Sequence, residues 1–266
     1  MFTSLKARSV LYLNPPAMTK LAQLALVLAS IAMPSPAQNI VDGFIGKVYT
    51  KSRREMMPYR LFIPRGYDTK LQYPLVIWLH GGGSAGTDNI GQISLDNALG
   101  THFWTRREIQ EKFPAFVLAP QSPAGWDNNV DKELSDELNL LLGILEAVRK
   151  EYRIDPNRMY VAGQSNGGMG AWGLITKRPG LFAAAIPLCG AGNPDIASRA
   201  AKTAVWAFHG ETDDVIPVRY SREMIDAIKK AGGNPRYTEY TGVGHEIWER
   251  VFKEPGLAEW LFAQRK

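Results

Sequence analysis

The sequence contains one cysteine, Cys189, among its 266 residues. A single cysteine forms no intramolecular disulfide, so the fold must depend on a packed core, which this length and 45% hydrophobic content allow. Cys189 closes the apolar run 183–188, and no histidine or second cysteine lies beside it at the spacing of a metal site. We therefore expect a buried, unreactive Cys189 and no bound metal.

Acidic residues are absent from the first 37 positions. This segment carries Lys6, Arg8 and Lys20, three of the charges behind the formal total of +5, so the remaining chain is left with +2. A nearly balanced chain lacks the basic excess with which proteins bind nucleic acid or anionic membranes. We expect neither partner.

The segment 21–33 is mostly apolar, yet it has too few residues to span a bilayer, which takes about 20. A lysine precedes it and small residues and prolines follow, as in a secretory signal peptide that is cleaved before Gln38. We predict a signal peptide over 1–37, with translation starting at Met1 or at Met18, and an exported chain without a stable membrane anchor. An uncleaved anchor is the alternative.

Short apolar runs alternate with amphipathic segments along the rest of the chain. The apolar runs predict strands at 59–63, 74–79, 116–119, 159–162 and 204–208. Apolar residues at three- and four-residue spacing, or the position after a predicted strand, predict helices at 134–152, 166–177, 219–231 and 257–265. This alternation favours an α/β class fold, a doubly wound, mostly parallel sheet in one domain over 38–266.

Polar segments directly follow four of these strands, at 80–83, 120–123, 163–168 and 209–214. The carboxyl ends of parallel strands meet at one edge of a sheet, where ligands bind. We expect the four segments to form a single site.

The third segment contains Gly163-Gln164-Ser165-Asn166-Gly167, a G-x-S-x-G sequence between a predicted strand and a predicted helix. A nucleophile elbow requires that strand–turn–helix context, in which the serine is exposed on a sharp turn. Ser165 is therefore the predicted nucleophile. The alternative is a turn with a structural role only.

A serine nucleophile needs an adjacent base, and the chain offers four histidines. With an elbow of this kind the chain order is serine, acid, histidine. His80 and His102 precede Ser165, and His209 lies at a strand end where it is expected to shape the turn. His245, in a glycine-rich loop before the last helix, is the predicted base.

The acid should lie between Ser165 and His245, directly after a late strand. Asp213 and Asp214 both meet this condition, whereas Asp195 lies in an earlier loop and Asp226 lies in a predicted helix. Spacing leaves Asp213 and Asp214 as equal alternatives.

An acyl transfer also needs donors for the oxyanion. We expect the backbone N–H groups of Asn166 and Gly82 in this role, with Gly81 and Gly83 as alternatives to Gly82. A phosphate-binding loop is the competing interpretation of 80–83, but the segment lacks the Lys-Ser/Thr pair of a P-loop, and no dinucleotide fingerprint is present. We expect no cofactor.

Together these motifs resemble bacterial α/β-hydrolases of the prolyl-oligopeptidase/dienelactone-hydrolase-like group, which includes phospholipase/carboxylesterase-like enzymes. The similarity extends over 45–265 and also rests on 154–160 and 237–261. It implies an α/β-hydrolase fold with a Ser-His-Asp triad, and its His-Gly-x-x-Asp pattern implies Asp213 as the acid. The elbow is also similar to those of polyhydroxybutyrate-depolymerase and feruloyl-esterase-like proteins.

An inserted cap domain usually follows the strand after the nucleophile helix. Residues 190–203 separate that strand from the next and are too few for a cap domain, so we expect an open cleft with walls from 84–113 and 121–131. Trp126 and Trp248, and also Trp104, are candidate substrate-binding residues in this cleft, with core packing as the alternative for each.

The predicted function is an exported carboxylesterase for short acyl or aryl (feruloyl-like) esters, as small molecules or attached to a polymer. A serine peptidase is the alternative. A non-catalytic binding protein on the same scaffold is a third.

Overall fold

The computed structural model describes residues 39–126 and 133–266, so the predicted signal peptide and positions 127–131 of the predicted cleft wall lie outside the described residues. The strands are β1 (Ile40–Val41), β2 (Phe44–Thr50), β3 (Met56–Phe62), β4 (Tyr73–Leu79), β5 (Phe116–Pro120), β6 (Ile154–Gln164), β7 (Ala184–Leu188), β8 (Ala204–Gly210) and β9 (Arg236–Tyr240). The α-helices are α1 (Leu95–Thr105), α2 (Arg107–Lys112), α3 (Asp136–Glu151), α4 (Asn166–Lys177), α5 (Arg219–Lys230), α6 (Trp248–Val251) and α7 (Leu257–Phe262). Short 3₁₀ helices are η2 (Gly82–Ser84), η3 (Gly91–Ile93) and η4 (Pro194–Ala200).

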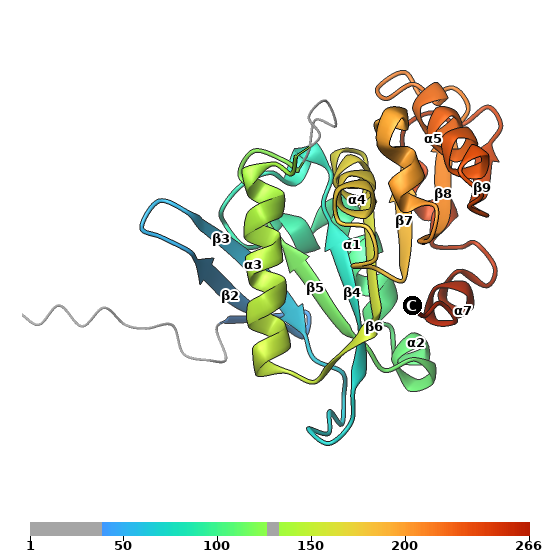
Figure 1. Cartoon of the computed structure of the whole chain (residues 1–266). Coiled ribbons are helices and arrows are strands. Elements are labelled where there is room, and N and C mark those ends of the chain that lie inside the picture. Colours follow the sequence, from blue (N-terminus) through green and yellow to red (C-terminus); the bar gives the residue numbers. More distant parts are fainter. Residues whose placement is uncertain (1–38, 127–132) are drawn as a thin grey trace, which may run out of the picture. The chain divides into compact units, whose positions relative to one another are not determined.

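The strands form one sheet in the order β1-β2-β3-β5-β4-β6-β7-β8-β9 (Figure 1). The pairs from β5 through β4 to β9 are parallel, and β1, β2 and β3 join antiparallel at one side. The predicted mostly parallel sheet is confirmed.

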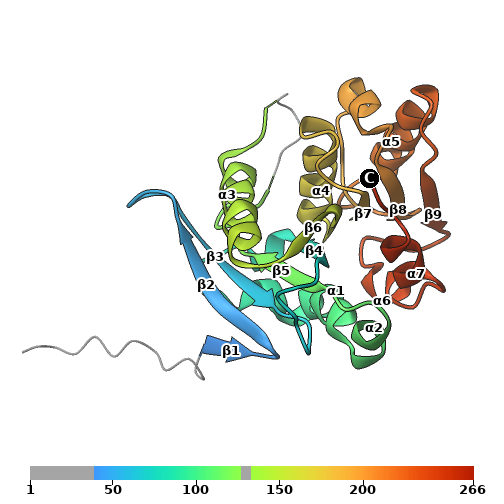
Figure 2. The ribbon, with the colours of Figure 1, turned by 60° about the horizontal axis from the view of Figure 1, so that its bottom comes forward.

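Helices cover both faces of the sheet. Figure 2 shows α3, α4 and α5 on one face and α1, α2, α6 and α7 on the other. Strand β4 has fully buried side chains on both faces: Ile77 and Leu79 belong to the cluster with α3, α4 and α5, while Val76 and Trp78 belong to the cluster with α1 and α6. This is why the inner strands are continuous apolar runs.

Helix α3 illustrates how the sequence specifies the covering helices. The Ser135 side chain caps its N-terminus by accepting a hydrogen bond from the N–H of Leu138 at 3.2 Å. Acidic residues occupy its first turn and basic residues its last turn, which complements the helix dipole. Its buried residues then recur on one face, as the periodicity predicted.

Strands β2 and β9 were not predicted as strands. Each lies at or next to an edge of the sheet and has partly exposed residues, so neither contains the continuous apolar run that identified the inner strands. Helix α1 was also missed. Its buried residues include Asn97, Gly100 and Thr101, and polar and glycine residues weaken the apolar periodicity.

The sheet order places two of the polar segments side by side. Strand β4 pairs with β6 in the register Leu79↔Gly163, so the loops that follow both strands start next to each other. From β4 the chain first crosses to β5 on one side and then returns to β6 on the other, which is the switch point at which open α/β sheets bind ligands.

The connection between β7 and β8 contains only the short helix η4 within the described residues, in agreement with the expected lack of a cap domain. Among the helices of residues 39–126 and 133–266, none combines the length and apolar character needed to cross a membrane.

We predict that Leu141→Ala lowers the free energy of unfolding by about 2–5 kcal/mol, because Leu141 is fully buried where α3 packs on the sheet. Urea unfolding with linear extrapolation measures the loss. Glu146→Ala, at an exposed position of the same helix, is the matched control and should stay within about 0.5 kcal/mol of wild type. Equal effects of the two substitutions would contradict the packing described for α3.

Candidate active site

Ser165 lies in a strained turn between β6 and α4. Its φ and ψ are 54° and −118°, a positive φ that is rare for residues other than glycine. The Ser165 N–H donates to the carbonyl of Leu188 at 2.8 Å, which anchors the turn to the end of β7. Backbone strain of this kind is frequent at functional sites, and it presents the half-buried Ser165 side chain at the end of the strand.

The two glycines around Ser165 are required by close backbone contacts. A Cβ at Gly167 would collide with the backbone carbonyl of Leu79, and a Cβ at Gly163 would collide with the carbonyl of Gly167. The elbow therefore rests directly on the end of β4, and no side chain separates the two loops.

His245 is hydrogen-bonded to Ser165 on one side and to Asp213 on the other. Its Nε2 lies 2.8 Å from Ser165 Oγ and its Nδ1 lies 2.7 Å from Asp213 Oδ2. The structure thus brings the three predicted residues together in the order nucleophile, base and acid, although they are far apart in the sequence. In this geometry His245 is placed to take the Ser165 proton while the carboxylate fixes the tautomer of the ring.

Burial separates the two neighbouring aspartates. Asp214 is exposed, whereas the Asp213 carboxylate is fully buried and accepts the N–H groups of Val215 and Ile216 at 2.9 and 2.8 Å, both on Oδ1. Burial alone would raise the pKa of Asp213, but the hydrogen bonds from His245 and from the two backbone N–H groups outweigh it and lower the pKa. Asp213 is therefore held as a carboxylate.

Two backbone N–H groups at helix starts are the candidates for the oxyanion donors. Asn166 is the first residue of α4 and Gly82 the first residue of η2, so both N–H groups precede the first hydrogen bond of their helix. Such groups are suited to an anion, so Asn166 and Gly82 remain the candidates for the oxyanion donors.

The glycine loop around Gly82 is held by a buried amide that sequence reasoning missed. Asn97 Oδ1 accepts the Gly81 N–H at 3.1 Å, and Asn97 Nδ2 donates to Ser84 Oγ at 2.7 Å. Asn97 lies within α1, away from any strand end, so no motif or position in the sequence indicated this role.

His80 joins the glycine loop to the loop after β5. Its Nε2 accepts the Ser122 N–H at 3.0 Å, so the proton is on Nδ1, which donates to the carbonyl of Gly81 at 2.8 Å. His80 is fully buried, and burial lowers its pKa, which keeps the ring neutral and able to make both contacts.

Trp126 packs in the core and does not provide an aromatic surface. It is 2% exposed, and its indole N–H donates to the carbonyl of His80 at 3.0 Å. Its backbone N–H donates to the side-chain oxygen of Asn166 at 2.8 Å, next to Gly125, where a Cβ would come within 2.6 Å of the same oxygen. The Asn166 side chain therefore ties the elbow to this loop. Trp104 is also fully buried.

Trp248 is buried as well, at 7% exposure, but it contacts the candidate site. Its ring meets the His245 ring edge to face at a centroid distance of 5.4 Å. Trp248 and Glu246 also line a pocket of about 520 Å³. Trp248 thus both lines a pocket and contacts His245.

Three buried side chains of metal-ligating type lie together behind the site. The ligand atoms of Cys189, His209 and Asp213 are within 4.8 Å of one another, a proximity that sequence spacing did not indicate. All three already have protein partners, since Cys189 Sγ donates to the carbonyl of His245 at 3.3 Å and His209 bonds to Asp213. Burial raises the pKa of the Cys189 thiol, which disfavours the thiolate that binds metals. Hydrogen bonds to protein groups therefore explain why these three side chains lie together.

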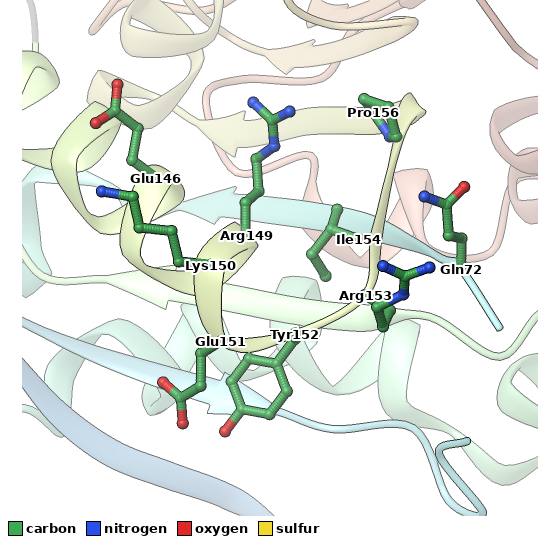
Figure 3. A pocket seen from close by; sticks show the side chains of 9 residues that line it. All are labelled: Gln72, Glu146, Arg149, Lys150, Glu151, Tyr152, Arg153, Ile154 and Pro156. Carbon is green, nitrogen blue, oxygen red and sulfur yellow. The ribbon is translucent and has the colours of Figure 1, made fainter. Parts of the chain in front are cut away.

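Figure 3 shows a second pocket, of about 450 Å³. It lies at the start of β6, whereas Ser165 follows the end of that strand. It is formed where α3 ends and β6 begins, and its lining residues are mainly charged: Gln72, Glu146, Arg149, Lys150, Glu151, Tyr152, Arg153, Ile154 and Pro156. Strand β4 runs beside β6 from Tyr73↔Ile154 at this pocket to Leu79↔Gly163 at the elbow, so roughly 20 Å separates the two. The pocket is not part of the candidate active site.

The sheet order, the elbow and the hydrogen-bonded serine, histidine and aspartate define the α/β-hydrolase class. The profile of the phospholipase/carboxylesterase family matches residues 68–255, more than half of the chain. The chain therefore belongs to this family.

Two relatives of the chain are described as esterases. A protein of Aspergillus terreus described as "Probable feruloyl esterase C" is 30% identical over 183 residues, which cover 66% of this chain and 62% of that protein. A crystal structure of a thermostable esterase has a TM-score of 0.81 and 36% identity, covering 85% of this chain and 64% of the other. The chain thus spans less than two thirds of each of these relatives.

The feruloyl esterase module from Clostridium thermocellum, solved in complex with sinapinate, has a TM-score of 0.63 and 17% identity. The match covers 87% of this chain and 93% of the module. At this level of identity the similarity shows a shared fold.

We predict that the protein becomes less stable as the pH falls below about 6.5, partly because His80 must remain neutral in the folded state. The unfolded chain takes up the proton near the ordinary pKa and the folded chain does so only at lower pH, so the unfolded state binds more protons in between. Urea unfolding from neutral pH to about pH 5 should show a steeper fall for wild type than for His80→Gln.

His102→Gln, at a partly exposed histidine, serves as the control, and we expect it to follow wild type. Equal slopes for wild type and His80→Gln would contradict the assignment of a neutral buried ring.

Proposed function

We propose that this protein is an exported serine carboxylesterase that hydrolyses short acyl or aryl esters, including feruloyl-like esters, through an acyl-enzyme. The observation that carries the proposal is the unbroken line of hydrogen bonds from Ser165 through His245 to the buried carboxylate of Asp213. Membership of the phospholipase/carboxylesterase family supports an ester as the bond that is cleaved.

In the first half of the reaction, Ser165 Oγ attacks the ester carbonyl carbon while His245 Nε2 accepts the hydroxyl proton. Asp213 stabilises the imidazolium that forms, because its carboxylate lies 2.7 Å from His245 Nδ1. The imidazolium then donates its proton to the departing alcohol, and the acyl group stays on Ser165.

In the second half, His245 takes a proton from water, whose oxygen attacks the acyl carbon. The imidazolium then returns that proton to Ser165 Oγ as the bond between Oγ and the acyl carbon breaks, which releases the acid and restores the enzyme. Both tetrahedral intermediates carry a negative oxygen. The N–H groups of Asn166 and Gly82 are assigned as its donors, since both are unused by their own helices and neither must reorient during the reaction.

Substrates with a compact or planar acyl group fit the features of the site. Between β7 and β8 the described chain contains η4 and no inserted cap, and an ester attached to a polymer would need a site that is open in this way. Trp248 offers an aromatic edge beside His245. Two relatives described as probable feruloyl esterases support aryl esters.

Export is proposed from the predicted signal peptide over 1–37. A relative from Arthroderma benhamiae described as an "Uncharacterized secreted protein" is consistent with it. The expected location is the periplasm or the medium.

Ser165→Ala should reduce hydrolysis of p-nitrophenyl acetate by about 10⁴-fold or more and abolish labelling by a fluorophosphonate probe, because no other group replaces the nucleophile. The assay panel should include longer p-nitrophenyl esters, methyl ferulate and peptide p-nitroanilides. We expect the highest kcat/KM for short acyl or feruloyl esters.

Full activity in Ser165→Ala would refute the nucleophile assignment. Faster cleavage of peptides than of esters by wild type would favour the peptidase alternative, and folded wild-type protein that neither turns over nor labels would favour a non-catalytic binding role.

Asp213→Asn should lower kcat by about 10⁴-fold, since an amide cannot stabilise the imidazolium and favours the wrong tautomer of His245. Asp214→Asn is the matched control: the residue is adjacent and exposed, and we expect a change of less than about twofold. Steady-state kinetics on one ester compares them. A larger loss in Asp214→Asn would reverse the assignment of the acid.

A further inference from the structure

The Asp213 carboxylate contacts two imidazole rings. Oδ2 lies 2.7 Å from His245 Nδ1 and 3.1 Å from Nε2 of His209, a histidine that is fully buried and does not touch Ser165. With the two backbone N–H groups on Oδ1, four donors surround the carboxylate.

The contacts of His209 determine where its proton is. Its Nε2 faces two acceptors, the carbonyl of Ile216 at 2.8 Å and Asp213 Oδ2, so Nε2 carries the proton. Its Nδ1 lies 2.7 Å from the hydroxyl of Ser221, which is also buried. Burial lowers the pKa of His209, and a neutral ring then accepts the Ser221 proton on Nδ1.

We propose that His209, with its tautomer fixed by Ser221, is a positioning residue that sets the orientation and the basicity of Asp213 and so tunes His245. This inference rests on the proposed function. The contacts form one line, Ser221 to His209 to Asp213 to His245 to Ser165, whose first two members lie outside the serine, histidine and aspartate assigned above.

His209 acts on His245 because both rings contact the same oxygen, Oδ2 of Asp213. The N–H of His209 draws negative charge on Oδ2 away from His245, so it weakens the stabilisation of the imidazolium while holding the oxygen in line with Nδ1. The titratable groups that act on this pair are His245, Cys189 at the end of β7 and Glu239 on β9. Of these, His245 is the one that changes charge during the proposed reaction.

A purely structural role for His209 is a distinct alternative, because the bond to the carbonyl of Ile216 would by itself hold the turn from 213 to 216. Loss of that bond would lower the stability and the folded fraction. It would leave the pH dependence of the remaining active molecules unchanged.

Three variants separate these roles. His209→Phe keeps the ring volume and removes both polar contacts, His209→Gln keeps an N–H donor that can reach Asp213, and Ser221→Ala removes the group that fixes the tautomer. Each is compared with wild type and with Leu141→Ala, which destabilises the core far from the site, by urea unfolding and by the pH profile of kcat/KM on p-nitrophenyl acetate.

We expect His209→Phe to lower kcat about 10- to 100-fold, because Asp213 Oδ2 is no longer held in line with His245 Nδ1. The acidic limb of the kcat/KM profile should move up by about half a pH unit or more, because the undiminished charge on Oδ2 then stabilises the imidazolium. His209→Gln should restore most of both effects, and Ser221→Ala should fall between them. Leu141→Ala should leave the limb where it is in wild type.

An unchanged limb and kcat in folded His209→Phe would overturn the proposal. If that variant does not fold, an unmoved limb in folded Ser221→Ala would also overturn it, because His209→Gln is expected to stay near wild type.

A readout without turnover separates this inference from the proposed function. The downfield proton resonance of His245 Nδ1–H in wild-type protein reports its bond to Asp213, and its pH titration should move in His209→Phe in the same direction as the kinetic limb. Wild type that fails to hydrolyse esters would refute the proposed function, whereas an unshifted resonance in a folded variant would refute the role of His209.

Discussion

The pairing of β4 with β6 is the constraint on which the site depends. In the register Leu79↔Gly163 the two strands end together, and the turn at Gly167 lies against the carbonyl of Leu79 without room for a Cβ. The elbow and the glycine loop are therefore positioned by backbone contact, which has little freedom to vary. A shift of one residue in this register would move Ser165 relative to both loops and turn the side chains of β6 to the opposite faces.

A buried carboxylate is the second requirement of the arrangement. Removing the Asp213 carboxylate from water is costly unless donors replace its hydration, and four N–H groups do so. Two of them come from the backbone of the same turn and two from histidines. Burial disfavours the ionised carboxylate, but it also strengthens the interaction of Asp213 with His245, because little solvent screens the pair.

Much of the fold and of the site was predictable because inner parallel strands are apolar on both faces and end at polar segments. Ser165 and His245 followed from a strand–turn–helix context and a shortage of histidines. Spacing did not distinguish Asp213 from Asp214; their difference in burial did. Trp126 had been a candidate for the cleft, but residue type does not reveal exposure, and the ring packs in the core.

The sequence by itself determined the alternation of strands and helices, the location of the elbow and the set of polar segments at strand ends, because local periodicity and glycine positions encode these features. Only the tertiary structure decided which side chains meet. The bonds of Asn97 to the glycine loop and of Ser221 to His209 join residues from separate elements, and such contacts leave no pattern along the chain. Ser165 is a serine in a recognisable turn by sequence; the sheet order brings it within 2.8 Å of His245.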